Sequence, residues 1–128
     1  MIQKFQKAER IFIPVNSIKT ETKNLKDFII ENFKVQYNEL NKIYEFIHKD
    51  QELVNIIFEL PNLIQNEVLY EKIELHLSDD FQEEILEVNV FSTLDIESIL
   101  TIEDQFIHQL YHKYSEQSVD KILILIEG

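Results

Sequence analysis

The chain has 128 residues, of which 45% are hydrophobic, enough for one domain with its own core. It has no cysteine and one glycine, Gly128, which excludes disulfides, thiol nucleophiles, cysteine-bound metals and the glycine-rich loops that bind nucleotides. Residues 1–50 hold nine Lys+Arg and seven Asp+Glu (net +2), and residues 51–128 hold three Lys and 17 Asp+Glu (net −14), giving −12 in all. We therefore expect the C-terminal part to repel nucleic acid and anionic lipid, and a charged partner to be a basic protein.

The N-terminal stretch "MIQKFQKAERIFIPV" lacks the continuous apolar core and cleavage site of a secretory signal. The longest aliphatic run, "ILILI" at 122–126, is far shorter than the roughly 18 apolar residues that a membrane span needs. A cytoplasmic protein with no membrane association is expected. "RIFIPV" is a candidate edge strand, because Pro14 has no N–H to donate within a sheet.

Apolar residues then recur at alternating spacings of three and four, a heptad pattern that predicts a long helix with a seam facing a partner helix. The seam residues are Ile30, Phe33, Tyr37, Leu40, Tyr44, Ile47, Val54 and Phe58. A continuous helix from Asn24 to Glu59 would be about 54 Å long, longer than a small domain is wide. Two alternatives follow: the helix breaks near Asp50 and folds back as a helical hairpin, or it projects and forms a homodimer or larger assembly. Pro61 is expected to end this helix or to begin a short one, "PNLIQNE".

The apolar period changes to two in the next segments, which predicts half-buried strands. In "YEKIELHL" the inward residues are Ile73, Leu75 and Leu77, and "EILEVNVF" repeats the alternation. The polar stretch "SDDFQEE" is expected to join the two strands as a hairpin loop.

A helix and a last strand are predicted in the C-terminal third. Thr93 or Asp95 can cap a helix whose apolar stripe is Ile99, Ile102, Phe106, Leu110 and Tyr114. "KILILIE" is continuously aliphatic, as in a strand covered on both faces, and a right-handed crossover would make it parallel to the preceding strand. The fold expected is a single α+β domain: a long helix or helical hairpin over about 20–60, followed by a ββαβ sheet layer over 61–128.

The candidate chemical sites are weak. On a helical wheel Asp104 and His112 each lie within about 40° of His108, and all three lie opposite the apolar stripe, so we expect a solvated face without a metal. "HQLYH" also lacks the glutamate of the zinc-protease motif "HExxH", and the loop acids lack the spacing and glycine of a calcium-binding EF-hand. His76 is expected at the surface. No catalytic, cofactor-binding or metal-binding residue is predicted.

A partner surface is the better-supported expectation, because clustered exposed aromatic residues mark interaction sites. Several aromatic side chains fall off the apolar faces, and acids of the hairpin loop could surround them. The candidate surface consists of Asp79, Asp80, Glu83, Glu84, Phe81, Phe91 and Tyr111.

The stretch "STLDIES", the helix containing "DQF" and the closing "KILILIE" resemble the C-terminal half of a family of small bacterial α+β proteins, often cyanobacterial, without an assigned function. The resemblance covers about residues 61–127. Some genes of this family are loosely associated with those of PIN-type ribonuclease toxins, so the resemblance implies a toxin–antitoxin context. It implies no catalytic residues.

Three functions are therefore expected in order. The first is a non-enzymatic antitoxin or immunity-type neutraliser of a basic protein, working without a cofactor. The second is a small enzyme with a site built from scattered carboxylates and histidines. The third is a structural subunit that assembles through the heptad seam.

Overall fold

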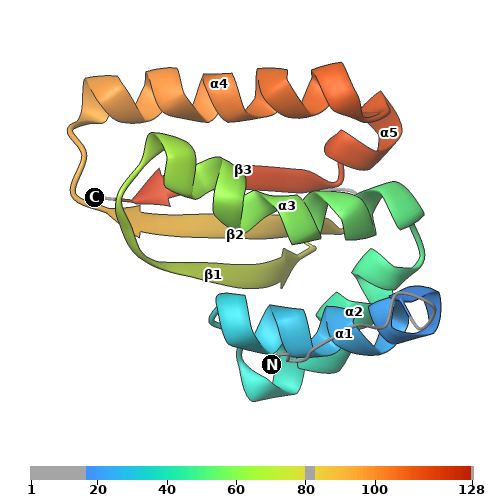
Figure 1. The fold of residues 1–128 in the computed structure, drawn as a ribbon. Coiled ribbons are helices and arrows are strands. Elements are labelled where there is room, and N and C mark those ends of the chain that lie inside the picture. The colour runs from blue at the N-terminus through green and yellow to red at the C-terminus, as the bar shows by residue number, and fades with distance from the viewer. Residues whose placement is uncertain (1–16, 80–82, 128) are drawn as a thin grey trace, which may run out of the picture.

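The computed structural model describes residues 17–79 and 83–127, with side chains from Leu25 onward. The elements in chain order are α1 (Ser17–Asn32), the 3-10 turn η2 (Tyr37–Glu39), α2 (Leu40–His48), α3 (Gln51–Glu67), β1 (Tyr70–Ser78), β2 (Ile85–Ser92), α4 (Ile96–Lys113), α5 (Glu116–Val119) and β3 (Ile122–Glu127). The α+β class and the order of helices before sheet are confirmed (Figure 1). The C-terminal part differs from the expected ββαβ layer by the short helix α5. The predicted edge strand "RIFIPV" lies outside the described residues.

The predicted long helix is interrupted twice. After α1, Lys34 pairs with β1: its N–H donates to the Ile73 carbonyl (2.8 Å), and its carbonyl accepts from the Leu75 N–H (3.0 Å). At the second break Asp50 is extended, and its carboxylate accepts from the N–H groups of Glu52 (3.0 Å) and Leu53 (3.3 Å), which starts α3. The break near Asp50 is confirmed, and a continuous helix from Asn24 to Glu59 is wrong.

The heptad seam is correspondingly divided. Phe33, Ile47 and Val54 are buried within the chain, whereas Tyr37 is 95% exposed and Ile30 is also exposed. The other seam residues, Leu40, Tyr44 and Phe58, are half-buried against the core. The chain itself therefore covers most of this seam. Assembly through the seam stays a prediction, but the uncovered apolar stripe that called for a partner helix is largely absent from the described residues.

Pro61 neither ends nor begins a helix, contrary to expectation, but lies inside α3. Proline in a helix interior removes a hydrogen bond and costs about 3 kcal/mol. Here the ring is buried beside Leu60 and Ile64, which are part of the core. The apolar burial of this stretch offsets the cost, and the helix continues to Glu67.

The sheet has the order β1-β2-β3. β1 is antiparallel to β2, with Leu75 opposite Val88, and β2 is parallel to β3, with Val88 opposite Ile124. The predicted hairpin and the parallel last strand are both confirmed. None of the helices in the described ranges is long and apolar enough to cross a membrane.

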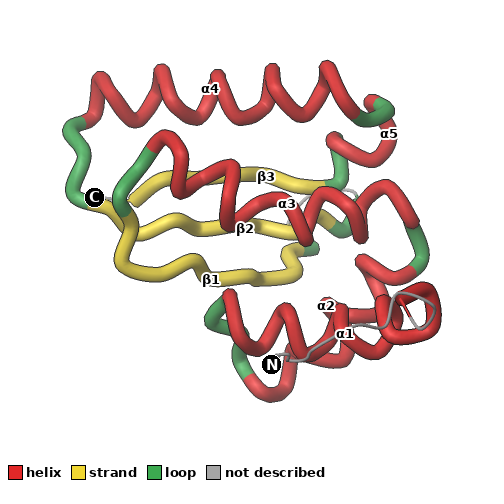
Figure 2. The backbone as a smooth tube through the Cα atoms, in the orientation of Figure 1, coloured by secondary structure: helices red, strands yellow, loops and turns green. Residues whose placement is uncertain are grey.

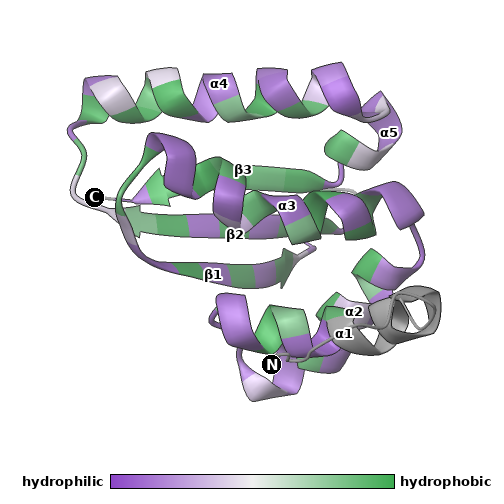
Figure 3. Ribbon diagram, viewed as in Figure 1, coloured by the Kyte–Doolittle hydropathy of each residue, from purple (hydrophilic) through white to green (hydrophobic). Residues whose placement is uncertain are grey.

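Helices cover one face of the sheet. α3 crosses in front of the strands and α4 runs along β3, while α1 and α2 lie beyond the β1 edge (Figures 1 and 2). The hydrophobic residues of α3, α4 and the strands meet in this layer (Figure 3). On β3, Ile122, Ile124 and Ile126 are buried in it, but Leu123 and Leu125 keep part of their surface exposed. The expectation that this strand is covered on both faces is wrong, because the helices of the described ranges pack on the face that Ile122, Ile124 and Ile126 share.

Candidate functional site

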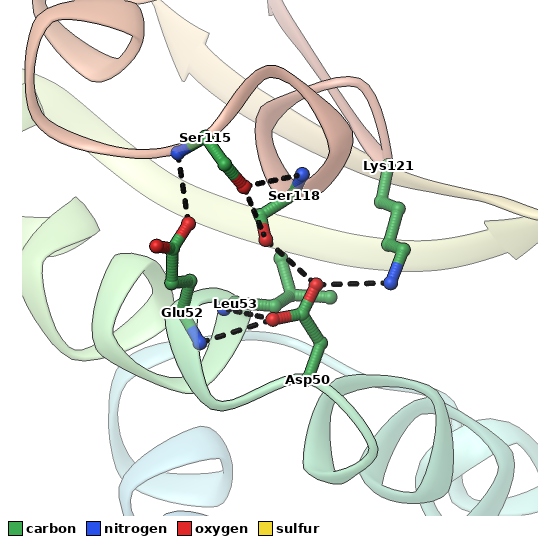
Figure 4. A network of polar contacts seen from close by, with 6 residues as sticks. All are labelled: Asp50, Glu52, Leu53, Ser115, Ser118 and Lys121. Atoms are coloured by element: carbon green, nitrogen blue, oxygen red, sulfur yellow. Dashed lines mark hydrogen bonds and ion pairs between the residues drawn. The ribbon is translucent and has the colours of Figure 1, made fainter.

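A polar network joins the start of α3 to the segment between α4 and β3 (Figure 4). The second carboxylate oxygen of Asp50 accepts from the Ser118 hydroxyl (2.7 Å) and from the Lys121 ammonium (2.9 Å). Beside it, Glu52 accepts from the backbone N–H of Ser115 (2.8 Å). These contacts fix segments that lie far apart in the sequence.

The electrostatics of this network point to a structural role. Burial raises the pKa of Asp50, but hydrogen bonds from Lys121, Ser118 and the Leu53 N–H outweigh it, so the pKa is lowered overall. A serine nucleophile needs a base and access to a substrate. Ser118 is only 4% exposed and donates its hydroxyl to a carboxylate that stays ionised. The network therefore holds the fold together and offers no reactive hydroxyl to solvent.

His76 is half-buried between two carboxylates, although a surface position was expected. Its Nδ1 lies 3.3 Å from Glu39 Oε1 and its Nε2 lies 3.2 Å from Glu74 Oε1. Burial lowers the pKa of His76, but the hydrogen bonds to Glu74 and Glu39 raise it more, so the pKa is raised overall. When it is protonated, the ring donates to both carboxylates and so links η2 to β1.

The histidines of α4 lie where the helical wheel placed them. Asp104, His108 and His112 are all exposed, so their solvated position is confirmed. Within the described ranges, no three acidic or histidine side chains are placed to hold a metal ion.

The predicted partner surface is not one surface. Asp79, Glu83 and Glu84 are exposed at the hairpin end of the sheet, where β1 ends and β2 begins. Phe91 lies near the other end of β2, about 20 Å away at 3.4 Å per residue. The Tyr111 hydroxyl, near the end of α4, donates to Asp120. Asp80 and Phe81 lie outside the described residues.

Three exposed apolar residues lie toward the end of the sheet opposite the hairpin, where β1 begins, β2 ends and α4 begins. Leu69 precedes β1 and is 93% exposed, and Ile96 and Leu100, in the first two turns of α4, are 75% and 65% exposed. The Ser92 hydroxyl donates to the Leu69 carbonyl (3.0 Å), which joins the start of β1 to the end of β2, just before α4. We call this region the sheet-end surface, and it consists of Leu69, Ile96 and Leu100 with the acids Glu71, Asp95, Glu97 and Glu127.

The sheet-end surface includes a hollow of about 360 Å³. Its lining residues are Leu69, Tyr70, Glu71, Phe91, Ser92, Thr93 and Glu127. All four acids of the surface are exposed. Asp95 accepts from the Ser98 N–H (2.8 Å), a bond that lowers the pKa of Asp95 and keeps its carboxylate charged. An apolar centre thus lies beside acidic side chains.

Reasoning from the sequence missed Leu69, Ile96 and Leu100. Leu69 precedes the alternating run and Leu100 lies beside the apolar stripe of α4, whereas Ile96 lies in line with the stripe, 18 residues before Tyr114, in the first turn of the helix. For Leu69 and Leu100 the position off the apolar pattern was the available signal, and Ile96 gave none. Exposed single apolar residues are common, so this signal becomes informative only when the fold brings them to one end.

Comparisons with protein-family models, with curated proteins and with solved structures give no match. The resemblance to the bacterial α+β family therefore stays a hypothesis.

Proposed function

We propose that this chain is a non-enzymatic binding module that docks a basic protein on the sheet-end surface and thereby neutralises it. The observation that carries the proposal is the exposure of Leu69, Ile96 and Leu100 at one end of the sheet, beside four exposed carboxylates.

The apolar residues supply affinity and the acids supply attraction. Covering a leucine or isoleucine side chain fully is worth about 1.5–3 kcal/mol, so three of them can anchor a partner. The acids beside them belong to the part of the chain with a net charge of −14. A negative potential of this kind speeds the encounter with a basic protein and disfavours nucleic acid.

The enzyme alternative has less support. A carboxyl group that acts as a general acid near neutral pH needs a raised pKa. Wherever the pKa of an Asp or Glu in the described ranges departs clearly from its ordinary value, it is lowered; these residues are Asp50, Glu52, Glu74 and Asp95. Such groups bind cations and cap helices, which agrees with a binding role.

The proposal is tested by capture from native cell extract treated with nuclease. The bait is the wild-type chain, the double variant Ile96→Asp/Leu100→Asp, or the matched control His108→Asp, which adds an acid elsewhere on α4. All substituted positions are exposed, so each bait should keep the wild-type circular dichroism spectrum and melting temperature.

We expect the wild-type chain and the control to retain the same basic protein in stoichiometric amount, and the double variant to lose at least about tenfold in affinity, or about 1.4 kcal/mol. Equal retention by the double variant would show that the partner docks elsewhere. Recovery of nucleic acid with no protein partner from untreated extract would contradict the neutraliser function.

A further inference from the structure

The hollow of the sheet-end surface lies where the pairing of β1 with β2 is interrupted. Tyr70 lies opposite Ser92 and Lys72 lies opposite Phe91, so Glu71 is an extra residue of β1 without a partner on β2. Successive residues of a regular strand point to opposite faces, and a β-bulge of this kind breaks that alternation and redirects a side chain. Tyr70 and Glu71 accordingly both line the hollow, although they are neighbours in the chain.

The hollow combines apolar surface with two carboxylates. Phe91 of β2 lies opposite Glu127 of β3, and both line the hollow together with Leu69 and Glu71. Glu71 and Glu127 are exposed. Within residues 17–79 and 83–127, no hydrogen bond or ion pair engages either carboxylate. Two negative charges without a partner in this part of the chain therefore lie beside the side chains of Leu69 and Phe91.

The Phe91 ring already attracts a cation within the chain. The ammonium of Lys72 lies 4.6 Å from the centre of the ring, where Glu74 also binds it at 2.9 Å. Lys72 itself is not among the described residues that line the hollow, so it leaves the part of the ring that does line it to another group. Because Glu74 matches the charge of Lys72, that ammonium does not neutralise Glu71 and Glu127.

We propose that this hollow receives an arginine side chain of the basic protein that docks on the sheet-end surface. The inference rests on the proposed function and names the side chain by which that partner is recognised. The stem of an arginine covers apolar surface, while its planar guanidinium stacks on an aromatic ring and donates hydrogen bonds in several directions. Here the stem contacts Leu69, the guanidinium lies on Phe91, and its N–H groups donate to Glu71 and Glu127.

The size and the charges of the hollow favour arginine over other occupants. Pockets for whole ligands measure about 300–1,000 Å³, so an open hollow of about 360 Å³ suits the end of one side chain better than a cofactor. The two carboxylates come from β1 and β3, whose backbones are two strand spacings, or about 10 Å, apart. A branched guanidinium bridges such a pair better than lysine, whose compact ammonium is more strongly hydrated and does not stack.

The test is an NMR titration of the full chain with three capped tripeptides. Each has glycine on both sides of a central arginine, lysine or citrulline, and citrulline keeps the shape of arginine without its charge. Peptide is added up to about 50 mM, at an ionic strength held near 0.1 M with NaCl. We expect the arginine peptide to shift the amide signals of Tyr70, Glu71, Phe91, Ser92 and Thr93. The citrulline peptide should bind at least about tenfold more weakly, and the lysine peptide at least about threefold.

The variant Glu71→Gln/Glu127→Gln keeps the size of both side chains and removes both charges, so the arginine peptide should bind it at least about tenfold more weakly. Both positions are exposed, and circular dichroism confirms that the variant is folded. If it unfolds, Glu127→Gln alone should weaken binding at least about threefold. The matched control is Glu45→Gln/Glu116→Gln, which removes two exposed acids from α2 and α5 and should stay within about twofold of the wild type.

Equal binding of the arginine and citrulline peptides, or of the arginine and lysine peptides, would overturn the inference. So would a failure of the arginine peptide to shift these signals, or an unchanged affinity in the folded glutamine variants. The outcome is separable from that of the capture experiment. A captured basic protein without arginine selectivity in the hollow would overturn this inference alone, whereas arginine selectivity with no captured protein would overturn the proposed function alone.

Discussion

Two side chains, Asp50 and His76, hold together segments that are distant in the sequence. Asp50 caps α3 with one carboxylate oxygen and binds Ser118 and Lys121 with the other. His76 joins β1 to Glu39 in η2. Neither role could be predicted from sequence, because periodicity identifies neighbours along one helix or strand and both contacts cross between elements.

Asp50→Ala removes a helix cap together with two part-buried side-chain hydrogen bonds. A cap is worth about 1 kcal/mol and each such bond about 0.5–1.5 kcal/mol, so we expect the free energy of unfolding to fall by about 2–4 kcal/mol. Urea denaturation measures this change. Asp95→Ala, which removes the bond from the Ser98 N–H that caps α4 and leaves the contacts of Asp50 in place, is the matched control and should cost clearly less. Equal losses in the two variants would contradict the role of Asp50 as a tie between elements.

His76 makes stability depend on pH in a defined direction. Because its pKa is raised in the folded protein, the folded state holds the proton more tightly than the unfolded chain. The contribution is complete below the ordinary pKa of 6.5 and is lost as pH rises through the raised value. We therefore expect the stability difference between wild type and His76→Gln to be largest near pH 6 and to shrink toward about pH 9. Urea denaturation at several pH values tests this, and a difference that grows with pH would refute it.

At the scale of elements, features set by the periodicity of one helix or strand were predicted from the sequence, whereas features set by contacts between distant segments were not. The hairpin and the stripe of α4 were predicted because one face of each is buried and the alternation records it. The continuous long helix was wrong, since its heptads continue through Lys34 and Asp50, where a backbone pairing with β1 and the start of a new helix capped by Asp50 interrupt it. The seam spacing was real, but the chain folds back on itself and buries it from within.

Substitutions of Tyr37 and Ile47 distinguish a continuous helix with one seam from the interrupted helices of the structure. In a continuous helix with one seam, Tyr37 and Ile47 would contribute alike. In the structure Ile47 is fully buried and Tyr37 is exposed. Ile47→Ala should therefore cost about 2–5 kcal/mol by leaving a cavity, and Tyr37→Ala should stay within about 0.5 kcal/mol. Thermal and urea denaturation of the two variants measure this. Comparable losses in the free energy of unfolding would favour the continuous seam instead.

For the molecule as a whole, the charge distribution was readable from the sequence but the sheet-end surface was not. The acidity of residues 51–128 is a property of composition. Which apolar side chains stay uncovered depends on where the helices end. Leu69 is exposed while its neighbour Val68 is buried, and Leu100 is exposed while Phe106 on the same helix is fully buried. Phe91 was assigned to the hairpin acids, yet it lines the hollow at the opposite end of the sheet.

The most direct test of the proposed function is the salt dependence of binding by the isolated protein. Affinity for the captured protein partner and for DNA and RNA is measured from about 0.05 to about 0.5 M NaCl. We predict that the protein partner binds with an association rate that falls steeply as salt rises, whereas its dissociation rate changes little, because the acids steer the encounter and the apolar anchors hold the complex. DNA and RNA should not bind measurably at any of these concentrations. Tight binding of nucleic acid at low salt, with no protein partner recovered, would contradict the account.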